Sequence, residues 1–197
     1  MAAAAGLPAP VAGVDEVGRG PLAGPLVAAA VILPAGWVPA GLDDSKRVPE
    51  ARRRTLAAAI RAEAAVGLAV IEVEEIDTMG LGPANDAALC RALAALPRSP
   101  AAALVDGRRL PRGLAVPGRA VVGGDGSVAA IAAASIVAKV ARDAMMAALD
   151  LCHPGYGWAE NRGYGTARHL EALATLGPTA QHRRSFAPVK EALKWFC

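Results

Sequence analysis

Apolar positions along the chain fall into short runs that predict strands and longer amphipathic stretches that predict helices. The predicted strands are short apolar runs bounded by Gly, Pro or acidic residues, at 11–16, 26–33, 66–73, 101–105 and 119–122. The predicted helices lie at 49–65, 85–96, 127–151 and 166–176, with one or two helical turns at 189–196. Because strands and helices alternate without an internal repeat, we expect a single α/β domain with a mixed sheet between helices.

The chain has 197 residues, a length that suits one domain with a sizeable core. Residues 1–10 contain mainly Ala and Pro and are expected to form a flexible leader. The domain itself is expected to span residues 11–188, and residues 189–197 to form a C-terminal tail.

Composition narrows the class of protein. Hydrophobic residues make up 54% and charged residues 20%, which excludes a largely disordered chain. The apolar runs are too short or too interrupted to span a bilayer, and residues 1–13 lack the positive region of a signal peptide. Three widely spaced cysteines without a CxxC motif argue against a disulfide framework and a thiolate zinc site. We therefore expect a cytoplasmic protein, whose net charge of +3 mildly favours polyanionic partners.

Acidic residues follow three of the predicted strands. Asp15 and Glu16 close the first strand, Asp106 closes the fourth, and Asp125 follows the fifth. In α/β sheets, sites form in the crevice outside strand ends, so these carboxylates are candidates for one shared site. Hard oxygen donors of this kind suit Mg²⁺ or Mn²⁺. Two such ions activate water and stabilise the leaving oxygen of a phosphodiester.

Simpler interpretations of these acids stay open. Asp after a strand is a common turn former, and Asp125 can cap the helix that follows it. Adjacent strand residues point to opposite faces. Asp15 and Glu16 therefore reach one metal cluster only if the strand ends or bends there, or if Glu16 contributes its carbonyl.

Glycines and basic residues add a second candidate chemistry. The Gly18-Arg19-Gly20 tripeptide is not a Walker A loop and leads into a strand, but its small residues let backbone N–H groups approach a sugar-phosphate. Basic residues interleave with aromatic ones between residues 156 and 186, a pattern that suits phosphate contact with base or sugar stacking. A solvated charged surface is the simpler alternative. The three histidines show no metal-binding spacing and are interpreted as structural, with a proton-shuttle role left open for His182.

Six motifs together resemble those of the ribonuclease HII family, in the family's order from Val11 to Pro188. They are VAGVDEVGRGPLAGP at 11–25, DDSK at 43–46, VDG at 105–107, AAASIVAKVARD at 132–143, GYGT at 163–166 with His169, and HRRSF at 182–186. The chain is identified as a member of this family by the whole set.

The resemblance implies a ribonuclease H-like α/β fold, with a central mixed five-stranded sheet flanked by helices and a small C-terminal helical extension. It implies endonucleolytic cleavage of the RNA strand of RNA/DNA hybrids and incision 5′ of single ribonucleotides in duplex DNA, leaving 3′-hydroxyl and 5′-phosphate ends. These duplexes are the implied partners of an expected monomer with no membrane partner. By motif, Asp15, Glu16, Asp106 and Asp125 are the implied catalytic acids, binding two Mg²⁺ or Mn²⁺ ions.

The resemblance also implies which residues contact the substrate. The Gly18-Arg19-Gly20 backbone would read the 2′-hydroxyl, and Tyr164 would pack on the neighbouring sugar. Lys46, Arg19 and Arg184 are the implied phosphate contacts, and Ser135 with Lys139 forms a supporting or packing pair on one helix face.

The chain departs from the family pattern around the fourth acid. The family usually reads KGDxK there, whereas this chain has Gly123 and Ser127 at the lysine positions. The lysine usual before the GYGT motif is Arg162, which keeps the charge. We therefore expect an active enzyme with weaker substrate binding or a stronger salt dependence.

Three alternatives remain. A ribonuclease HIII cleaves hybrids but handles single ribonucleotides poorly; it usually carries an N-terminal substrate-binding domain, for which ten leader residues are too few. A hybrid-binding protein without turnover would be expected to lack one of the acids. A structural or nucleotide-binding α/β protein is disfavoured because the sequence has no phosphate loop.

Overall fold

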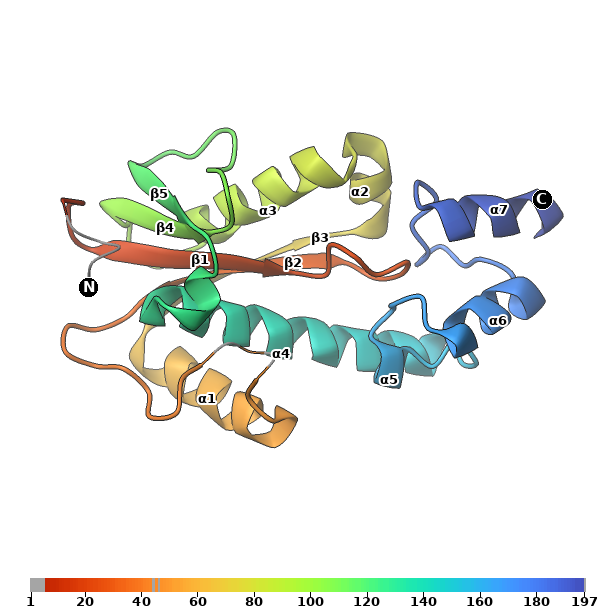
Figure 1. Cartoon of the computed structure of the whole chain (residues 1–197), viewed down its shortest axis with the longest axis horizontal. Coiled ribbons are helices and arrows are strands. Elements are labelled where there is room, and N and C mark those ends of the chain that lie inside the picture. The colour runs from red at the N-terminus through yellow and green to blue at the C-terminus, as the bar shows by residue number, and fades with distance from the viewer. Residues whose placement is uncertain (1–5, 44, 46, 197) are drawn as a thin grey trace.

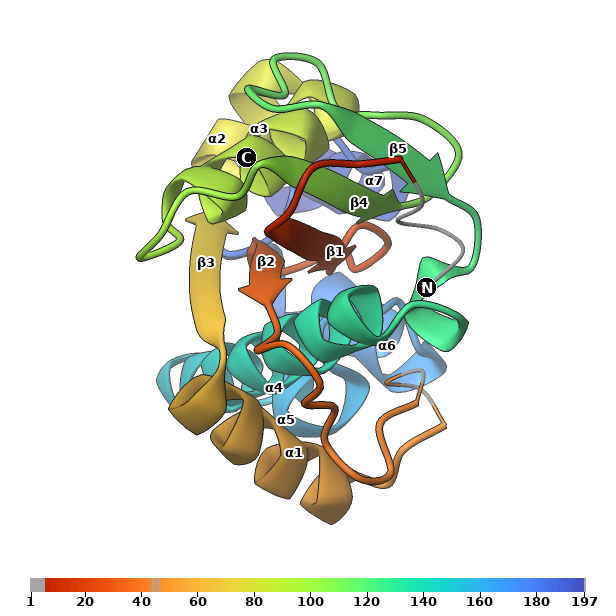
Figure 2. The same ribbon diagram turned by 90° about the vertical axis from the view of Figure 1, so that its left-hand side faces the viewer.

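The computed structural model describes residues 6–43, 45 and 47–196, in which five strands form one mixed sheet. The sheet order is β3-β2-β1-β4-β5, so β1 is the central strand (Figures 1 and 2). β1 pairs antiparallel with β2 and parallel with β4; β2–β3 is antiparallel and β4–β5 parallel. The strands are β1 (Val11–Val17), β2 (Leu26–Ile32), β3 (Ala65–Ile71), β4 (Ala102–Asp106) and β5 (Gly118–Val121). The predicted mixed five-stranded sheet is confirmed.

Helices cover both faces of this sheet. In Figures 1 and 2, α2 (Val73–Met79) and α3 (Leu81–Ala94) lie on one face, and α1 (Glu50–Glu63) and α4 (Ala129–Cys152) lie on the other. The fully buried strand β2 explains the arrangement, because its side chains alternate between the two faces. Leu26, Ala28, Ala30 and Ile32 join the core under α3, and the three residues between them join the core under α1 and α4.

Small residues let α4 approach the central strand closely. A Cβ atom at Gly13 in β1 would lie 2.1 Å from the backbone carbon of Ala130, near the start of α4. Any side chain at this position would push the helix away from the strand. The alanine-rich first half of α4 thus packs directly against the strand that carries Asp15.

The C-terminal elements pack around the loop that joins β1 to β2. They are α5 (Trp158–Asn161), α6 (Ala167–Leu176) and α7 (Ala187–Phe196), and they lie beyond one end of the sheet (Figure 1). Leu22 of the loop packs with Leu173 and Val189, and Ala23 packs with Trp158. The predicted helical extension therefore packs against the loop between β1 and β2. Its last helix begins at Ala187, before the predicted tail.

Some predicted boundaries are wrong. The third strand ends at Ile71, and Val73 instead begins a helix with Glu74 and Glu75 in its first turn, where they favour the positive end of the helix dipole. Gly80, with φ of 81°, separates α2 from α3, so the next helix begins at Leu81 and not at residue 85.

The start of α4 also differs from the prediction. Residues Gly124–Gly126 form a separate 3₁₀ turn, η2, and α4 begins at Ala129 instead of residue 127.

No helix in the described residues is both long and apolar enough to cross a membrane.

Candidate active site

The topology brings the predicted acids to one place. β1, β4 and β5 are parallel, so the residues that follow their carboxyl ends meet at one edge of the sheet. Val14 pairs with Val105, which sets Asp15 and Asp106 at corresponding positions of adjacent strands. Asp125 comes from η2, immediately beyond β5. All four acids line one cavity of about 410 Å³.

Glu16 reaches the same cavity as Asp15 although neighbouring strand residues point to opposite faces. The pairing of β1 with β4 stops at Val14, whereas β1 continues to Val17 against β2 alone. On the β4 side, no strand then separates the two faces beyond Asp15. The expected condition, that the strand ends or bends at Glu16, is not met as stated, because β1 itself continues to Val17; what ends there is only its pairing with β4.

The turn that carries Asp125 is fastened to Asp106. The Gly124 N–H donates to Oδ1 of Asp106 at 2.8 Å, and the Ser127 hydroxyl donates to the Gly123 carbonyl at 3.0 Å. The alternative that Asp125 caps the following helix is wrong, because the N-cap of α4 is Val128 and makes no side-chain cap.

Burial and mutual repulsion act on the carboxylates. Burial raises the pKa of Asp15 well above its ordinary value, and the charges of Glu16 and then Asp106 raise it further, whereas a hydrogen bond from Ser135 lowers it. Burial also raises the pKa of Glu16, against the opposing effect of the Arg19 guanidinium 3.4 Å away. A cation in the cavity would relieve this repulsion and return both groups to the ionised form.

The donor set fits a hard divalent cation. Carboxylate oxygens are the donors that Mg²⁺ and Mn²⁺ prefer, and the described lining of the cavity includes no Cys or His. Among the described residues, no group of three or more His, Cys, Asp or Glu side chains is already arranged to hold a metal ion as it stands. The fit is therefore one of donor chemistry around a shared cavity.

Three residues of α4 also line the cavity. Ser135, Lys139 and Arg142 all line it, because residues four and seven apart share one helix face. The Ser135 and Ser45 hydroxyls lie 2.9 Å apart, and Lys139 forms a 2.6 Å ion pair with Asp143. Sequence reasoning gave Arg142 no role, although its spacing from Ser135 along the motif is a usable signal.

Gly20 of the glycine loop lies beside Tyr164, which lines the cavity. Tyr164 lines the cavity and is 47% exposed, and a Cβ atom at Gly20 would lie 3.4 Å from the tyrosine ring. Gly18 is buried, whereas Arg19 and Gly20 are exposed. The predicted substrate-binding residues Gly18, Arg19, Gly20 and Tyr164 are thus brought together next to the acids.

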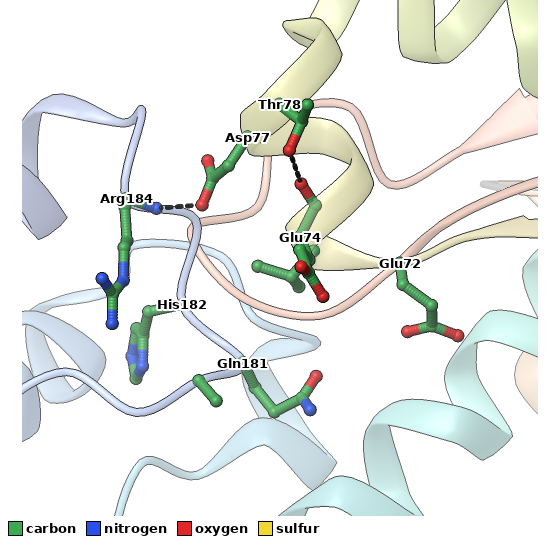
Figure 3. Close-up of a pocket in the computed structure, with 9 residues that line it drawn as sticks. Glu72, Glu74, Asp77, Thr78, Gln181, His182 and Arg184 are labelled. Carbon is green, nitrogen blue, oxygen red and sulfur yellow. Dashed lines mark hydrogen bonds between the residues drawn. The ribbon is translucent and has the colours of Figure 1, made fainter.

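Of the two remaining predicted phosphate contacts, the structure describes only Arg184. Lys46 lies outside the described residues. Arg184 lines a different cavity, of about 500 Å³, together with Glu74, Asp77 and Gln181 (Figure 3). There its backbone N–H donates to Asp77 at 2.8 Å. A phosphate contact by Arg184 stays a prediction.

The histidines His169 and His182 are buried and bonded to each other. Their Nε2 atoms lie 3.1 Å apart, and the Trp158 indole N–H donates to His169 Nε2 at 3.0 Å. His169 Nδ1 lies 2.9 Å from the Tyr164 carbonyl. This contact pattern agrees with a structural role. Through the Tyr164 carbonyl, the histidine pair also helps to fix the backbone that carries the tyrosine side chain.

Comparison with known proteins places the chain among ribonucleases. Residues 12–189 match the model of the family described as Ribonuclease HII. A curated Ribonuclease HII of Rhizorhabdus wittichii is 58% identical over 184 residues, covering 93% of this chain and 91% of the relative. The crystal structure of the ribonuclease H2 from Pyrococcus horikoshii OT3 superposes with a TM-score of 0.81 at 25% identity, over 94% of this chain and 98% of that one. A ribonuclease HIII in complex with Mn²⁺, Bst-RNase HIII, shares the fold with a TM-score of 0.75 at 21% identity, over 94% of this chain and 69% of that one.

Proposed function

Since this chain belongs to the ribonuclease HII family, we propose that the four-carboxylate cavity is its catalytic centre and that it incises DNA 5′ of a single embedded ribonucleotide. Family membership establishes the coarser activity. The protein is a hydrolase, an endonuclease that cleaves RNA in RNA/DNA hybrids and leaves 5′-phosphate products. The proposal concerns the residues that perform this cleavage and the minimal substrate they accept.

The observation that carries the proposal is the shared cavity. Four acids from β1, β4 and η2 line it together with Tyr164, and Gly20 of the glycine loop lies beside the tyrosine ring. A phosphodiester placed at the acids would thus have its sugar next to exposed backbone N–H groups and an aromatic ring. Recognition of one sugar next to the reacting phosphate is what incision at a single ribonucleotide requires.

We propose that Asp15, Glu16, Asp106 and Asp125 hold two Mg²⁺ or Mn²⁺ ions. The family depends on divalent metals, and the repulsion that raises the pKa of Asp15 favours a bound cation. Bound there, the ions would supply an activated water and charge stabilisation for the leaving 3′-oxygen. Asp106 would also keep the η2 turn in place through its bond to Gly124.

The remaining residues would bind and orient the duplex. The N–H groups of the Gly18–Gly20 loop would donate to the 2′-hydroxyl, which distinguishes RNA from DNA. Tyr164 would pack on the adjacent deoxyribose, and its exposed ring is free to do so. Arg19 would approach the phosphate, since its exposed guanidinium lies next to Glu16 at the cavity.

The test uses an end-labelled DNA duplex with one ribonucleotide, a long RNA/DNA hybrid and an all-DNA duplex of the same sequence. Each is incubated with the protein in Mg²⁺, in Mn²⁺ and in EDTA, beside an Asp15→Asn variant. We expect metal-dependent incision 5′ of the ribonucleotide, giving 3′-hydroxyl and 5′-phosphate ends, and its loss in the variant. Light scattering on the same preparation is expected to show a monomer.

Other outcomes would change the assignment. Cleavage of the long hybrid alone would remove the single-ribonucleotide part of the proposal and favour activity of the ribonuclease HIII kind. Binding of the hybrid without any cleavage in either metal would contradict the catalytic assignment and favour a binding role.

A further inference from the structure

Arg183 is fully buried and its guanidinium bonds only to backbone carbonyls among the described residues. One Nη donates to Gly18 at 2.6 Å and to Gly24 at 2.8 Å, and the other donates to Arg19 at 3.1 Å. Nε makes a second bond to Gly24 at 3.1 Å. Burial, aided by the nearby charge of Arg142, lowers the pKa of Arg183 to about 9. Keeping this charge in the interior therefore costs desolvation free energy.

These bonds fix the direction in which the glycine loop presents its N–H groups. In a planar trans peptide unit, the C=O and the N–H point in opposite directions. Because the carbonyls of Gly18 and Arg19 point inward to Arg183, the N–H groups of Arg19 and Gly20 point outward. Both residues are exposed, and neither N–H donates to another residue in the part of the chain that the structure describes.

The outward N–H groups lie next to the tyrosine of the candidate site. Gly20 is close enough to Tyr164 that an added Cβ would touch its ring at 3.4 Å. The loop itself leaves little freedom at Gly18, which has φ of 96° and packs against Arg142. Arg183 thus fixes, from the buried side of the loop, the N–H groups of Arg19 and Gly20, which would face a sugar bound beside Tyr164.

Helix α2 in turn holds the segment that carries Arg183. The Asp77 carboxylate accepts hydrogen bonds from the Arg184 N–H at 2.8 Å, the Ser185 N–H at 3.0 Å and the Ser185 hydroxyl at 2.6 Å (Figure 3 shows the first). The Arg183 N–H also donates to the Leu22 carbonyl at 2.8 Å. A continuous set of contacts therefore runs from α2 through Arg183 to the glycine loop.

We infer that Arg183 and Asp77 are positioning residues for ribose recognition: Arg183 orients the N–H groups of Arg19 and Gly20 toward a 2′-hydroxyl, and Asp77 holds Arg183 in place. This inference rests on the proposed function. A lysine cannot replace Arg183, because a single ammonium lacks the planar fork that reaches three carbonyls at once. The predicted consequence is a loss of discrimination between ribose and deoxyribose that exceeds any general loss of duplex binding.

The test compares two equilibrium constants for each variant. Fluorescence anisotropy in EDTA, where no hydrolysis is expected, gives Kd for a duplex with one ribonucleotide and for the all-DNA duplex of the same sequence. Arg183→Lys and Asp77→Ala are measured beside two controls. Glu74→Ala removes a carboxylate from the same helix, and Leu89→Ala weakens the core on α3 away from the loop.

We expect Arg183→Lys to lower the ribose preference about tenfold, as the loss of well-aimed hydrogen bonds would, with little change in all-DNA binding. Asp77→Ala should also lower the ribose preference. It leaves Arg183 itself in place and serves as the folded variant if Arg183→Lys does not fold. Both controls should keep the wild-type ratio, even though Leu89→Ala lowers the melting temperature.

The outcomes separate the two proposals. A wild-type preference for ribose that survives in folded Arg183→Lys and in Asp77→Ala overturns this inference alone. An equal fall of the ratio in Leu89→Ala also overturns it, because general loosening would then be the cause. Wild-type protein that neither prefers nor cleaves the ribonucleotide duplex overturns the proposed function and this inference with it.

Discussion

The buried histidine pair predicts a loss of stability in mild acid. Partners assign both tautomers: His169 Nε2 accepts from Trp158, so its proton is on Nδ1 and is donated to the Tyr164 carbonyl. His182 Nδ1 accepts from the Thr179 N–H at 3.0 Å, so its proton is on Nε2 and points to His169. With both rings neutral, every ring nitrogen has a partner. A proton added to His182 Nδ1 would displace the bond from the Thr179 N–H and leave the Thr179 hydroxyl, 3.1 Å away, as the acceptor.

The magnitude follows from the pKa of His182. Burial, with smaller effects from His169 and His153, lowers that pKa from 6.5 to about 4. Above pH 6.5 the ring is neutral in both folded and unfolded chains, so the shift has no effect on stability. Between pH 6.5 and 4 the unfolded chain binds a proton that the folded chain does not, and the free energy of unfolding falls. The 6.5-to-4 difference corresponds to a loss of about 3 kcal/mol, complete below pH 4.

Urea unfolding at pH 7, 6, 5 and 4 in EDTA measures this effect, with His182→Gln as the reference. Asp15 and Glu16 titrate in both proteins, and their raised pKa values act in the opposite direction, favouring the folded state as the pH falls. The difference between wild type and variant removes their contribution. We expect the wild-type advantage to shrink by about 3 kcal/mol from pH 7 to 4, because folding lowers the pKa of His182 from 6.5 to about 4. A difference that stays constant over this range would refute the assigned neutral pair.

Three further predictions concern the site and its supports. Asp106→Asn should abolish cleavage yet raise the melting temperature in EDTA. The substitution relieves the repulsion on Asp15 and Glu16, and the amide oxygen of the new side chain still accepts the hydrogen bond from the Gly124 N–H. A lower melting temperature would contradict this reasoning. Gly13→Ala should lower the free energy of unfolding in urea by about 3 kcal/mol or more, since the new Cβ would lie 2.1 Å from the backbone of α4. A loss under about 1 kcal/mol would show that α4 moves away from the strand freely. Gly123→Lys with Ser127→Lys should tighten hybrid binding at low salt and steepen the plot of log Kd against log salt by roughly one to two, because each added phosphate contact releases a further counterion. Without these lysines the chain itself is therefore expected to show weaker binding with a shallower salt dependence, so the stronger salt dependence expected from the sequence is wrong in sign. Gly126→Ser, an uncharged change in the same turn, is the control, and parallel plots would mean that the two missing lysines carry no phosphate contact.

Local pattern was enough to predict most of the elements and the identity of the acids. Periodicity identifies the apolar run of β2, and each acid follows the apolar run of its own strand directly in the sequence, in β1 and in β4, so strand-end position identifies the acids. The pattern failed at residues 72–80, where an acidic helix start and a glycine break resembled a strand followed by a charged loop. Propensity is weak over so few residues, and packing of Ile76 against the core decides the helix.

By itself, the sequence determined the α/β class, the mixed sheet and the set of residue types that suits a metal-dependent nuclease. Only the tertiary structure decided that Glu16 shares the cavity of Asp15, because that depends on where β4 stops beside β1. It also decided that Arg184 faces α2 while its neighbour Arg183 holds the glycine loop. The physical reason is the range of the interaction. Arg183 bonds to carbonyls 159 to 165 positions earlier, and a backbone carbonyl leaves no mark in the sequence of the side chain that will bind it.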